Sequence, residues 1–435
     1  MSVVGKFGYT ETEVGWIPSD WECNKLGNYL TLLTGAPFKS ELFSPDEGIP
    51  LIRIRDLLRG FSETGYTGEY VDRYLINFGD VLVGMDGEFH VVRWKGEQSL
   101  LNQRVLKISA VPGLSDEGFL FYLVAGAIGT IQKGISATTV KHLSTKDLQN
   151  LIAAIPPLPE QQKIAAILTA VDDKLDVISR QIATTKTLKQ GLMQTLLRSG
   201  KATWPIVPLH EVAEVRTGVA KGKNGLKAPV ELPYLRVANV QDGHIDLTEV
   251  KLISVESNQV ERYSLRVGDV LMTEGGDFDK LGRGDVWEGK ISPCLHQNHV
   301  FAVRPAIARL NPYYLAALAA SDYGRQYFLS CSKRTTNLAS INSTQLKAFP
   351  VLLPPIQEQQ RIAGIVDAAN AKIGVLESKL THYQCVKRGL MQKLLTGTWR
   401  VKLDPVAPVG ARPNDSANCA ATSATAMNAL MEEMV

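Results

Sequence analysis

The sequence predicts a mixed α/β protein built as two similar halves, each a globular domain followed by one long helix. A chain of 435 residues exceeds the roughly 250 to 300 residues that one hydrophobic core serves, so at least two domains are expected. Hydrophobic residues make up 45% and charged residues 21%, which is typical of a folded protein and excludes collagen-like and wholly disordered chains. An internal repeat and a helical apolar pattern supply the remaining evidence.

The repeat is clearest near the middle and near the end of the chain. The 42 residues from Pro156 to Leu197 align without a gap with those from Pro354 to Leu395, and 18 of the 42 positions are identical. Upstream, Gly79-Asp-Val-Leu and Gly268-Asp-Val-Leu recur at a different spacing, so each half is a variable region followed by a nearly constant one. The predicted boundaries are 1–155 and 201–353 for the globular domains, 156–200 and 354–397 for the helices, and 398–435 for a disordered tail.

Both repeated segments are predicted to be helices. Pro157, Pro159 and Glu160 suit the first turn of the first helix. Apolar residues then recur at steps of three and four, as in a coiled coil. The predicted seam consists of Ile164, Leu168, Val171, Leu175, Ile178, Ile182, Leu192 and Leu196 in the first helix and of Ile362, Val366, Ile373, Leu376, Leu380, Leu390 and Leu394 in the second. Each helix could pack on its own globular domain, but two matched seams in one chain favour pairing with each other.

Both seams break at the same place. The positions concerned are Thr185 and Lys189 in the first helix and Tyr383 and Lys387 in the second. Either these polar residues lie in the seam and define its register, or the seam shifts to Leu188 and Val386.

The globular regions alternate short β-rich runs with glycine-rich turns, and a short helix precedes each long one. The short helices are predicted from matching capping pairs, Ser144 with Asp147 and Asn342 with Gln345. The β-rich runs are Val81 to Val83, Val91 to Trp94, Val105 to Ile108, Leu235 to Val237, Val270 to Met272 and Val300 to Val303.

The sequence offers no complete catalytic or metal motif. Asn311-Pro-Tyr-Tyr approximates an adenine-methyltransferase signature but lacks its second proline, so we interpret it as a helix start. The run from Gly218 to Gly225 lacks the Lys-Ser/Thr pair of a phosphate loop, and no carboxylate pattern completes a metal site at His296 and His299. Charges between Asp269 and Lys290 are interpreted as loop charges rather than as a nuclease motif. We expect a non-catalytic chain without a metal or a cofactor of its own.

Charge, cysteine spacing and hydropathy restrict the cellular context. Five widely spaced cysteines indicate neither a disulfide framework nor a zinc knuckle, which fits a reducing cytoplasm. The longest apolar stretch, from Phe119 to Ile128, is about half of the ~20 residues that a membrane-spanning helix needs. Because the net charge is only +3, evidence for DNA binding must come from local patterns.

Side chains suited to reading DNA gather in the turns beside the repeat landmarks. Arg and Lys pair with guanine, Asn and Gln pair with adenine, and lysines among glycines suit phosphate contacts. The candidate DNA-binding residues are Arg53, Arg55, Arg93, Asn102, Gln103 and Arg104 in the first half and Lys221, Lys223, Arg236, Asn239, Lys280, Arg283, Gln297 and Asn298 in the second. Any one of them could equally be an ordinary polar turn residue, so the set carries more weight than its members.

These features resemble the specificity subunit of type I restriction-modification systems. The resemblance rests on Pro-Pro-[Leu/Ile]-x-Glu-Gln-Gln-[Lys/Arg]-Ile-Ala from Pro156 and from Pro354, on Gly-Leu-Met-Gln-x-Leu-Leu closing each helix, and on GDVLMTEGGDFDKLGRGDVW from Gly268 to Trp287. It extends from Gly15 to Gly397 and leaves out the tail.

The resemblance implies a two-part DNA reader. Each globular region would be a target recognition domain that reads one half of an asymmetric, interrupted DNA sequence. The helices would form an antiparallel pair with pseudo-two-fold symmetry that sets the spacing of the half-sites. Two modification subunits with S-adenosylmethionine would dock on the chain and methylate adenine N6, and restriction/translocase subunits using ATP and Mg²⁺ would join them.

The length of the helices agrees with a spacer. A 38-residue helix from Glu160 to Leu197 is ~57 Å long at 1.5 Å per residue, which exceeds the ~34 Å of one DNA turn. Two other hypotheses stay open. One is a self-sufficient DNA methyltransferase or nuclease whose catalytic motif is unrecognised, and the other is a coiled-coil scaffold without DNA contact.

Overall fold

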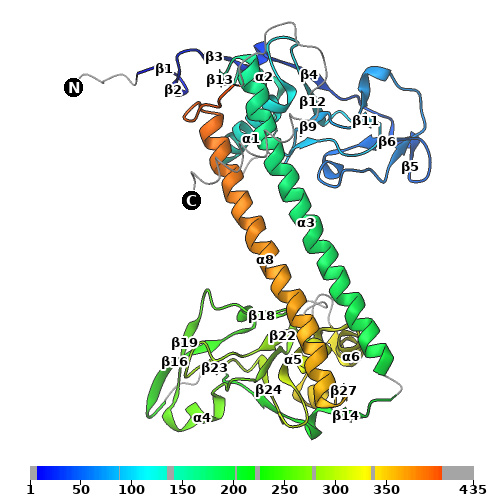
Figure 1. Cartoon of the computed structure of the whole chain (residues 1–435). Coiled ribbons are helices and arrows are strands. Elements are labelled where there is room, and N and C mark those ends of the chain that lie inside the picture. Colours follow the sequence, from blue (N-terminus) through cyan, green and yellow to red (C-terminus); the bar gives the residue numbers. More distant parts are fainter. Residues whose placement is uncertain are drawn as a thin grey trace, which may run out of the picture. The chain divides into compact units, whose positions relative to one another are not determined.

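The computed structural model describes residues 7–87, 89–134, 142–200, 203–220, 226–276, 281–334 and 339–403. The chain divides into two compact units. Unit 1 comprises Met1–Val177 with Leu380–Val435, and unit 2 comprises Ile178–Lys379. Two long helices, α3 (Leu158–Gly200) and α8 (Ile356–Leu394), each contribute to both units (Figure 1). Most of the tail predicted to be disordered, from residue 404 onward, lies outside the described residues.

The globular part of unit 1 is built around a mixed set of small sheets. Its four-stranded sheet has the order β10-β9-β12-β4, and a second sheet has the order β5-β7-β6-β11-β8. The strands are β1 (Tyr9–Thr12), β2 (Gly15–Pro18), β3 (Glu22–Lys25), β4 (Leu30–Thr34), β5 (Phe43–Ser44), β6 (Ile49–Ile52), β7 (Gly65–Tyr66), β8 (Leu75–Ile76), β9 (Val81–Gly84), β10 (Val91–Arg93), β11 (Ser99–Leu101), β12 (Val105–Ala110) and β13 (Ile152–Ile155). Strand β13 pairs antiparallel with β3, which ties the residues before α3 to the start of the unit.

Unit 2 repeats this plan. Its four-stranded sheet has the order β15-β24-β20-β22, which matches the first sheet strand for strand. The strands are β14 (Ile206–Pro208), β15 (Ala213–Thr217), β16 (Pro229–Leu235), β17 (Val240–Gln241), β18 (His244–Ile245), β19 (Lys251–Glu256), β20 (Val270–Thr273), β21 (Gly275–Gly276), β22 (Gly284–Val286), β23 (Leu295–His296), β24 (Val300–Pro305), β25 (Lys333–Arg334), β26 (Ala339–Ser340) and β27 (Pro350–Leu352). Here β27 pairs antiparallel with β14.

The shorter helices are α1 (Glu117–Gly134) and α2 (Thr145–Asn150) in unit 1 and α4 (Val260–Tyr263), α5 (Pro312–Ala320), α6 (Asp322–Cys331) and α7 (Ser343–Lys347) in unit 2. Both predicted capping pairs are confirmed. Ser144 and Asp147 exchange backbone-to-side-chain hydrogen bonds at α2, and Asn342 and Gln345 do the same at α7.

Five of the six predicted β-rich runs coincide with strands of the four-stranded sheets. The predicted run from Leu235 to Val237 is wrong beyond its first residue, because β16 ends at Leu235 and a 3-10 turn begins at Val237. The amide N–H of Arg236 donates to Asn239 Oδ1 at 2.9 Å, which closes that turn.

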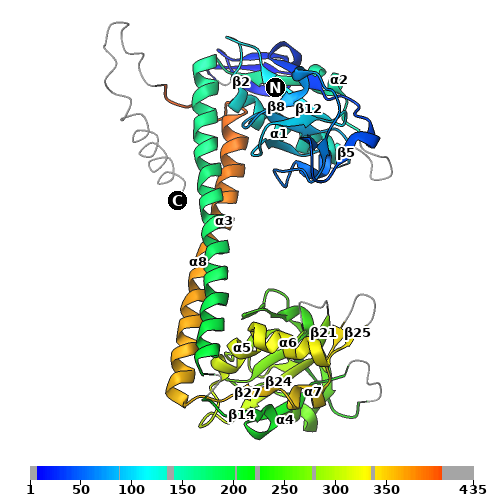
Figure 2. The ribbon, with the colours of Figure 1, turned by 90° about the vertical axis from the view of Figure 1, so that its right-hand side faces the viewer.

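Within each unit the two long helices pack side by side in opposite directions (Figure 2). In unit 2, Lys186 Nζ lies 2.8 Å from Glu377 Oε1, and Lys189 Nζ lies 3.1 Å from Asn370 Oδ1. As the residue number rises along α3, the number of its partner on α8 therefore falls, which defines an antiparallel pair. In unit 1, Lys387 Nζ likewise lies 2.7 Å from Asp172 Oδ1. The prediction of paired antiparallel helices is confirmed.

Most of the predicted seam is buried, but its break differs between the helices. On α8 the seam shifts to Val386, which is 6% exposed, whereas on α3 Leu188 is 59% exposed and Lys189 faces the partner helix. Leu192 is 38% exposed, contrary to the prediction, because the neighbouring Met193 and Leu197 turn into the core of unit 2 instead. The seam of α8 thus shifts to Val386, whereas the seam of α3 keeps the polar Lys189 against the partner helix.

The repeated Glu-Gln-Gln motif joins each long helix to its globular domain. Gln161 Oε1 accepts the amide N–H of Asp116, and its Nε2 donates to the carbonyls of Leu114 and Pro156. In unit 2, Gln359 makes the matching bonds to Asn311, Arg309 and Pro354. Both glutamines are almost fully buried. These three bonds position the first turn of each helix against the start of α1 or α5.

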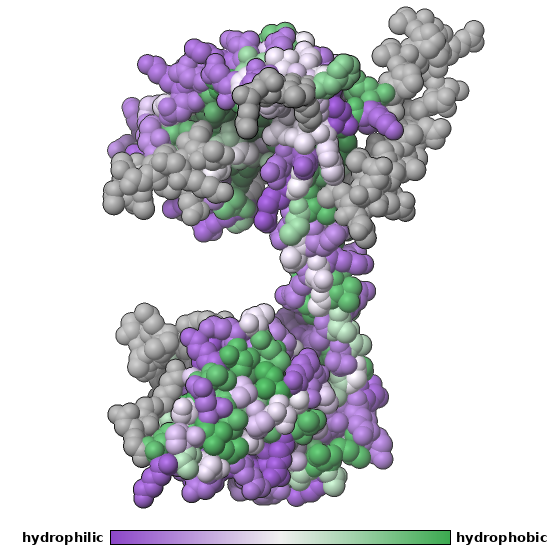
Figure 3. Space-filling model, turned by 90° about the vertical axis from the view of Figure 1, so that its left-hand side faces the viewer, coloured by the Kyte–Doolittle hydropathy of each residue, from purple (hydrophilic) through white to green (hydrophobic). Residues whose placement is uncertain are grey.

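The surface of the molecule is mixed in character. On the face seen in Figure 3, hydrophilic residues cover most of each unit and are interrupted by separate hydrophobic patches. Within the described residues, no helix is both long enough and apolar enough to cross a membrane.

Candidate nucleic-acid interface

A tight turn between two strands brings the predicted polar residues of unit 1 together. This turn, Asn102 to Arg104, joins β11 to β12. The amide N–H of Asn102 donates to the carbonyl of Ile52 at 3.3 Å, next to Arg53, and the N–H of Gln103 donates to the carbonyl of Ala36 at 2.9 Å. The turn and the end of β6 therefore lie beside each other, with Gln103 and Arg104 exposed to solvent.

The same hydrogen bonds build the equivalent turn in unit 2, between β23 and β24. The amide N–H of Gln297 donates to the carbonyl of Leu235, next to Arg236, and the N–H of Asn298 donates to the carbonyl of Val219, both at 2.9 Å. The carbonyl of Arg283 accepts the N–H of Thr273 at the same end of the sheet. We call Arg53, Arg55, Asn102, Gln103 and Arg104 turn cluster 1, and Arg236, Arg283, Gln297 and Asn298 turn cluster 2.

A small glycine makes each turn possible. A Cβ atom on Gly35 would lie 2.2 Å from the carbonyl oxygen of Leu101, and one on Gly218 would lie 2.0 Å from that of His296. No real side chain tolerates such distances, so the backbone can approach the turn this closely only with glycine at both positions.

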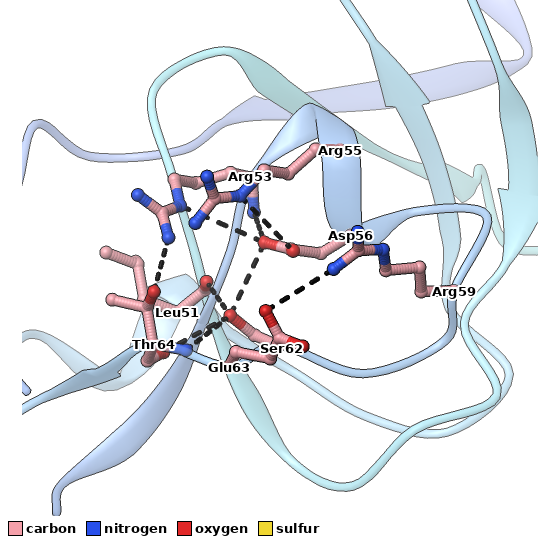
Figure 4. A network of polar contacts seen from close by, with 8 residues as sticks. All are labelled: Leu51, Arg53, Arg55, Asp56, Arg59, Ser62, Glu63 and Thr64. Atoms are coloured by element: carbon pink, nitrogen blue, oxygen red, sulfur yellow. Dashed lines mark hydrogen bonds and ion pairs between the residues drawn. The ribbon is translucent and has the colours of Figure 1, made fainter. Parts of the chain in front are cut away.

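Arg53 is held by a polar network at the end of β6 (Figure 4). Its guanidinium donates to Thr64 Oγ1, and its Nε lies 3.9 Å from the buried carboxylate of Asp56. Asp56 Oδ2 also accepts the amide N–H of Arg53 at 2.9 Å. Arg55 lies beside the same carboxylate, at 3.7 Å, with 60% of its side chain exposed. The network orients Arg53, whereas most of the Arg55 side chain stays exposed to solvent.

Asn239 takes the place of Asp56 in unit 2, and its role is structural, contrary to the prediction that it reads a base. It is 3% exposed, its Oδ1 accepts the amide N–H of Arg236, and its Nδ2 donates to the carbonyls of Asp246 and Glu249. Every polar atom of the amide is thus engaged inside the unit. The neighbouring guanidinium of Arg236 contacts the Glu249 carboxylate at 3.2 Å.

Three arginines of the clusters share an unusual feature. Among the described residues, the buried side-chain nitrogen or oxygen atoms that lack a hydrogen-bond partner are Nε of Arg53, of Arg236 and of Arg283. Buried polar groups are nearly always hydrogen-bonded in folded proteins, so these three donors are unusual. Arg53 and Arg236 occupy equivalent positions in the two units, whereas Arg283 precedes β22.

Both turns are also held by ion pairs that were not predicted from the sequence. In unit 1, Asp86 bonds to Arg104 and to His142 Nδ1, and in unit 2 Glu274 bonds to His299 Nδ1. Burial raises the pKa of Asp86, but hydrogen bonds from His142 and Arg104 outweigh it, so the pKa lies below its usual value. No sequence signal marked these pairs, because their members lie 18 to 56 residues apart.

The remaining candidates lie elsewhere. Arg93 is at the opposite end of β10 from the turn, and its guanidinium lies 5.0 Å from the ring centroid of Phe121 on α1, so it does not join turn cluster 1. Lys221, Lys223 and Lys280 lie outside the described residues.

Two of the residues considered as parts of catalytic or metal motifs, Asn311 and His296, have structural roles. Asn311 begins α5, and its Oδ1 accepts the amide N–H of Tyr314, whose side chain is fully buried in the core. His296 is buried, with Nδ1 donating to the carbonyl of Val300 at 2.7 Å. In the part of the chain that the structure describes, no group of three or more His, Cys, Asp or Glu side chains could hold a metal ion.

Comparisons with known proteins give one family throughout. The model of the type I restriction modification DNA specificity domain matches twice, over residues 18–186 and 201–381. The specificity subunit of the type I restriction enzyme EcoBI from Escherichia coli is 28% identical over 433 residues, which cover 89% of this chain and 87% of that protein. The putative MjaX specificity subunit of Methanocaldococcus jannaschii is 30% identical over 215 residues, about half of either chain.

The fold has solved counterparts as well. The crystal structure of the type I restriction-modification S subunit from M. genitalium matches with a TM-score of 0.56 at 16% identity, over 86% of this chain and 96% of that one. Because the family model matches most of the chain in two successive copies, the chain belongs to the type I restriction-modification DNA specificity family and is a specificity subunit rather than an enzyme in its own right.

Proposed function

We propose that the two units read the two halves of an asymmetric, interrupted DNA sequence through turn clusters 1 and 2. Family membership makes the chain a DNA specificity subunit, and the duplicated turns supply an equivalent surface in each unit. The observation that carries the proposal is the equivalent turn in each unit, which matching backbone hydrogen bonds position beside Arg53 in unit 1 and Arg236 in unit 2. Arginine is the side chain that most often contacts guanine, and asparagine and glutamine pair with adenine.

The two clusters carry different side chains on turns with matching backbone hydrogen bonds. Turn cluster 1 presents Asn102, Gln103 and Arg104, whereas unit 2 presents Gln297, Asn298 and His299 at the matching positions. Unlike side chains on a like scaffold would select unlike bases, so the two half-sites should differ in sequence. The target recognition domains correspond to residues 1–155 and 201–353, and residues 156–200 and 354–397 form the spacer helices.

The long helices fit the part of a spacer and docking platform. Two modification subunits that carry S-adenosylmethionine and methylate adenine N6 would bind to them, and restriction subunits that use ATP and Mg²⁺ would complete the enzyme. A solved structure on the assembly of a type I system, similar in fold with a TM-score of 0.52, supports the idea that chains of this shape work inside a complex.

Arginine substitutions test the reading role. In the complex with modification subunits, Arg53→Lys keeps the charge but loses the planar fork, and Arg53→Ala loses both. Methylation of a library of DNA targets should show that Arg53→Ala costs ~1 to 3 kcal/mol at one position of one half-site. Arg236→Ala should act in the other half-site only. Arg361→Ala, an exposed arginine of α8, is the control and should leave the target unchanged.

Other outcomes would decide against the proposal. Equal weakening on every sequence would make these arginines phosphate contacts rather than base readers. Methyl transfer to DNA by the purified chain alone would establish a self-sufficient enzyme. The absence of sequence-selective DNA binding by the complex would leave only a scaffold.

A further inference from the structure

The two turns end on different polar residues, Arg104 in unit 1 and His299 in unit 2. Their backbones occupy equivalent positions. The carbonyl of Arg104 accepts the amide N–H of Met85 at 3.0 Å. In unit 2 the carbonyl of His299 accepts the amide N–H of Glu274, also at 3.0 Å. More than half of each side chain is exposed to solvent. His299 is not among the candidate DNA-binding residues predicted from the sequence, so it adds a polar side chain to the surface of unit 2.

A carboxylate that follows a central strand of the sheet holds each of these side chains. Asp86, two residues after β9, accepts a hydrogen bond from Nη1 of Arg104. Glu274, directly after β20, accepts one from Nδ1 of His299. The carboxylates come from neighbouring positions rather than the same one, because the backbone equivalent of Glu274 is Met85. Different residues thus produce the same arrangement, in which a partly buried carboxylate fixes an exposed side chain at the end of the turn.

The carboxylate determines the hydrogen-bonding character of His299. An ionised carboxylate only accepts hydrogen bonds, so Nδ1 of the ring carries the proton that bonds to Glu274. In the neutral ring Nε2 is then an acceptor. The amide nitrogen of Asn298, which can only donate, lies 3.4 Å from this Nε2. His299 therefore presents an acceptor at the ring nitrogen that Glu274 does not hold.

Arg104 presents donors at the equivalent place. A guanidinium has five N–H donors, so it can bind Asp86 through Nη1 and still offer a pair of donors to a base. In the major groove, guanine O6 and N7 accept such a pair. Adenine and cytosine instead present an exocyclic amino group, which requires an acceptor. The two turns thus end on side chains that suit different bases.

We propose that the last residue of each turn determines one base of a half-site, with Arg104 selecting guanine and His299 selecting adenine or cytosine through the exocyclic amino group. Asp86 and Glu274 act as positioning residues that direct these side chains toward the major groove. The inference rests on the proposed function, since it assumes that the turns contact DNA. It adds His299 as a specificity-determining residue and assigns a class of base to each turn.

Replacing the acceptor by donors tests the assignment. In the complex with modification subunits, His299→Arg should change the preferred base at one position of one half-site from adenine or cytosine to guanine. The new preference should be about tenfold or more, and the other half-site should stay the same. Methylation of a library of DNA targets measures both. His210→Arg is the matched control, because His210 is an exposed histidine of unit 2 beside the opposite end of β24, and it should leave the target unchanged.

Removing the carboxylate tests the positioning role separately. Glu274→Ala keeps His299 but frees its ring, and should lower the discrimination against guanine at that position about tenfold. Glu274→Gln should restore most of this discrimination, because its side-chain oxygen still accepts from Nδ1. Hydrogen exchange in β20 verifies that both variants are folded. Full discrimination in Glu274→Ala, or equal losses in the two folded variants, would contradict the positioning role.

The remaining outcomes separate this inference from the proposed function. An unchanged base preference in His299→Arg, or equal weakening on every sequence, would overturn the inference. The proposed function would survive that result if Arg53→Ala and Arg236→Ala each still altered one half-site. If those two variants left both half-sites unchanged as well, the proposed function itself would be overturned.

Discussion

Glu160 and Glu358 occupy the same place in the two copies of the helix motif, yet their surroundings are unlike. Glu160 is 1% exposed and accepts hydrogen bonds from Trp21 Nε1 and from the Arg400 guanidinium, which also binds Asp20. Glu358 lies near the surface and pairs with Arg361, one turn along its own helix. In unit 1 the residues after α8 thus fold back onto the start of α3.

The adjacent glutamines, in contrast, have the same surroundings in both units. Gln161 and Gln359 make the same three hydrogen bonds in both units. Duplication has therefore retained the bonds that join helix to domain, whereas the glutamate of the motif has a different partner in each copy. In unit 1 the partner of this glutamate is Arg400, which follows α8.

The largest difference between the units is expected at the end of the helix motif. Leu390 is 4% exposed in unit 1, whereas Leu192, the same residue of Gly-Leu-Met-Gln-x-Leu-Leu, is 38% exposed in unit 2. Leu390→Ala should lower the free energy of unfolding by about 3 kcal/mol, and Leu192→Ala by less than ~1 kcal/mol, because only the first leaves a cavity. Hydrogen-exchange mass spectrometry, which separates the two units, measures both. Equal losses would contradict the shifted seam.

Acid should destabilise unit 2 selectively. Burial lowers the pKa of His296 to about 4, whereas unit 1 has Leu101 at this position. The unfolded chain binds a proton near pH 6.5 that the folded unit excludes, so stability is complete above that pH and falls as the pH drops toward 4. The loss is up to about 3 kcal/mol.

Copying unit 1 provides the control for this pH effect. His296→Leu should remove the loss between pH 6.5 and pH 4, as read from hydrogen exchange in β23 and β24. The variant should be slightly less stable at neutral pH, because the carbonyl of Val300 loses its donor. A wild-type unit 2 that is equally stable at pH 7 and pH 4.5 would show that the histidine is not buried as described.

A smaller effect is expected from the ion pair between Arg400 and Glu160. Arg400→Ala leaves the buried Glu160 carboxylate with Trp21 as its remaining partner, and should cost unit 1 about 2 kcal/mol, reduced by the partial exposure of the arginine. Arg361→Ala removes the exposed partner of Glu358 and should leave the stability of unit 2 unchanged within error. Denaturant unfolding monitored by hydrogen exchange distinguishes the two, and a loss of equal size in both units would remove the asymmetry.

The sequence predicted the elements well because their signals are local or repeated. Helix capping pairs and the apolar steps of the seam involve residues three or four positions apart. The 42-residue repeat is found by aligning one segment of the sequence with another. Several candidate DNA-binding residues lie together in turns, since they flank strand ends, and their role in DNA binding stays a prediction. Asn239 was misassigned because an amide in a turn looks the same in sequence whether it faces solvent or closes a buried bend.

Other features depend on contacts that the sequence does not display. Arg400 and Glu160 lie 240 residues apart. The motif Gly-Leu-Met-Gln-x-Leu-Leu offers four apolar side chains, and α8 buries Leu390 and Leu394 while α3 buries Met193 and Leu197. Identical residues are therefore buried differently in the two helices, because each helix end packs on a different globular surface.

The proposed function requires the paired helices to act as a spacer between two dissimilar DNA-reading domains. Inserting four residues after Ile182 and four after Leu380 would lengthen both helices by ~6 Å while keeping them opposite each other. Methylation mapping of DNA treated with the assembled complex should then report the same two half-sites separated by one or two additional base pairs. An unchanged gap, with both half-sites still methylated, would contradict the spacer role.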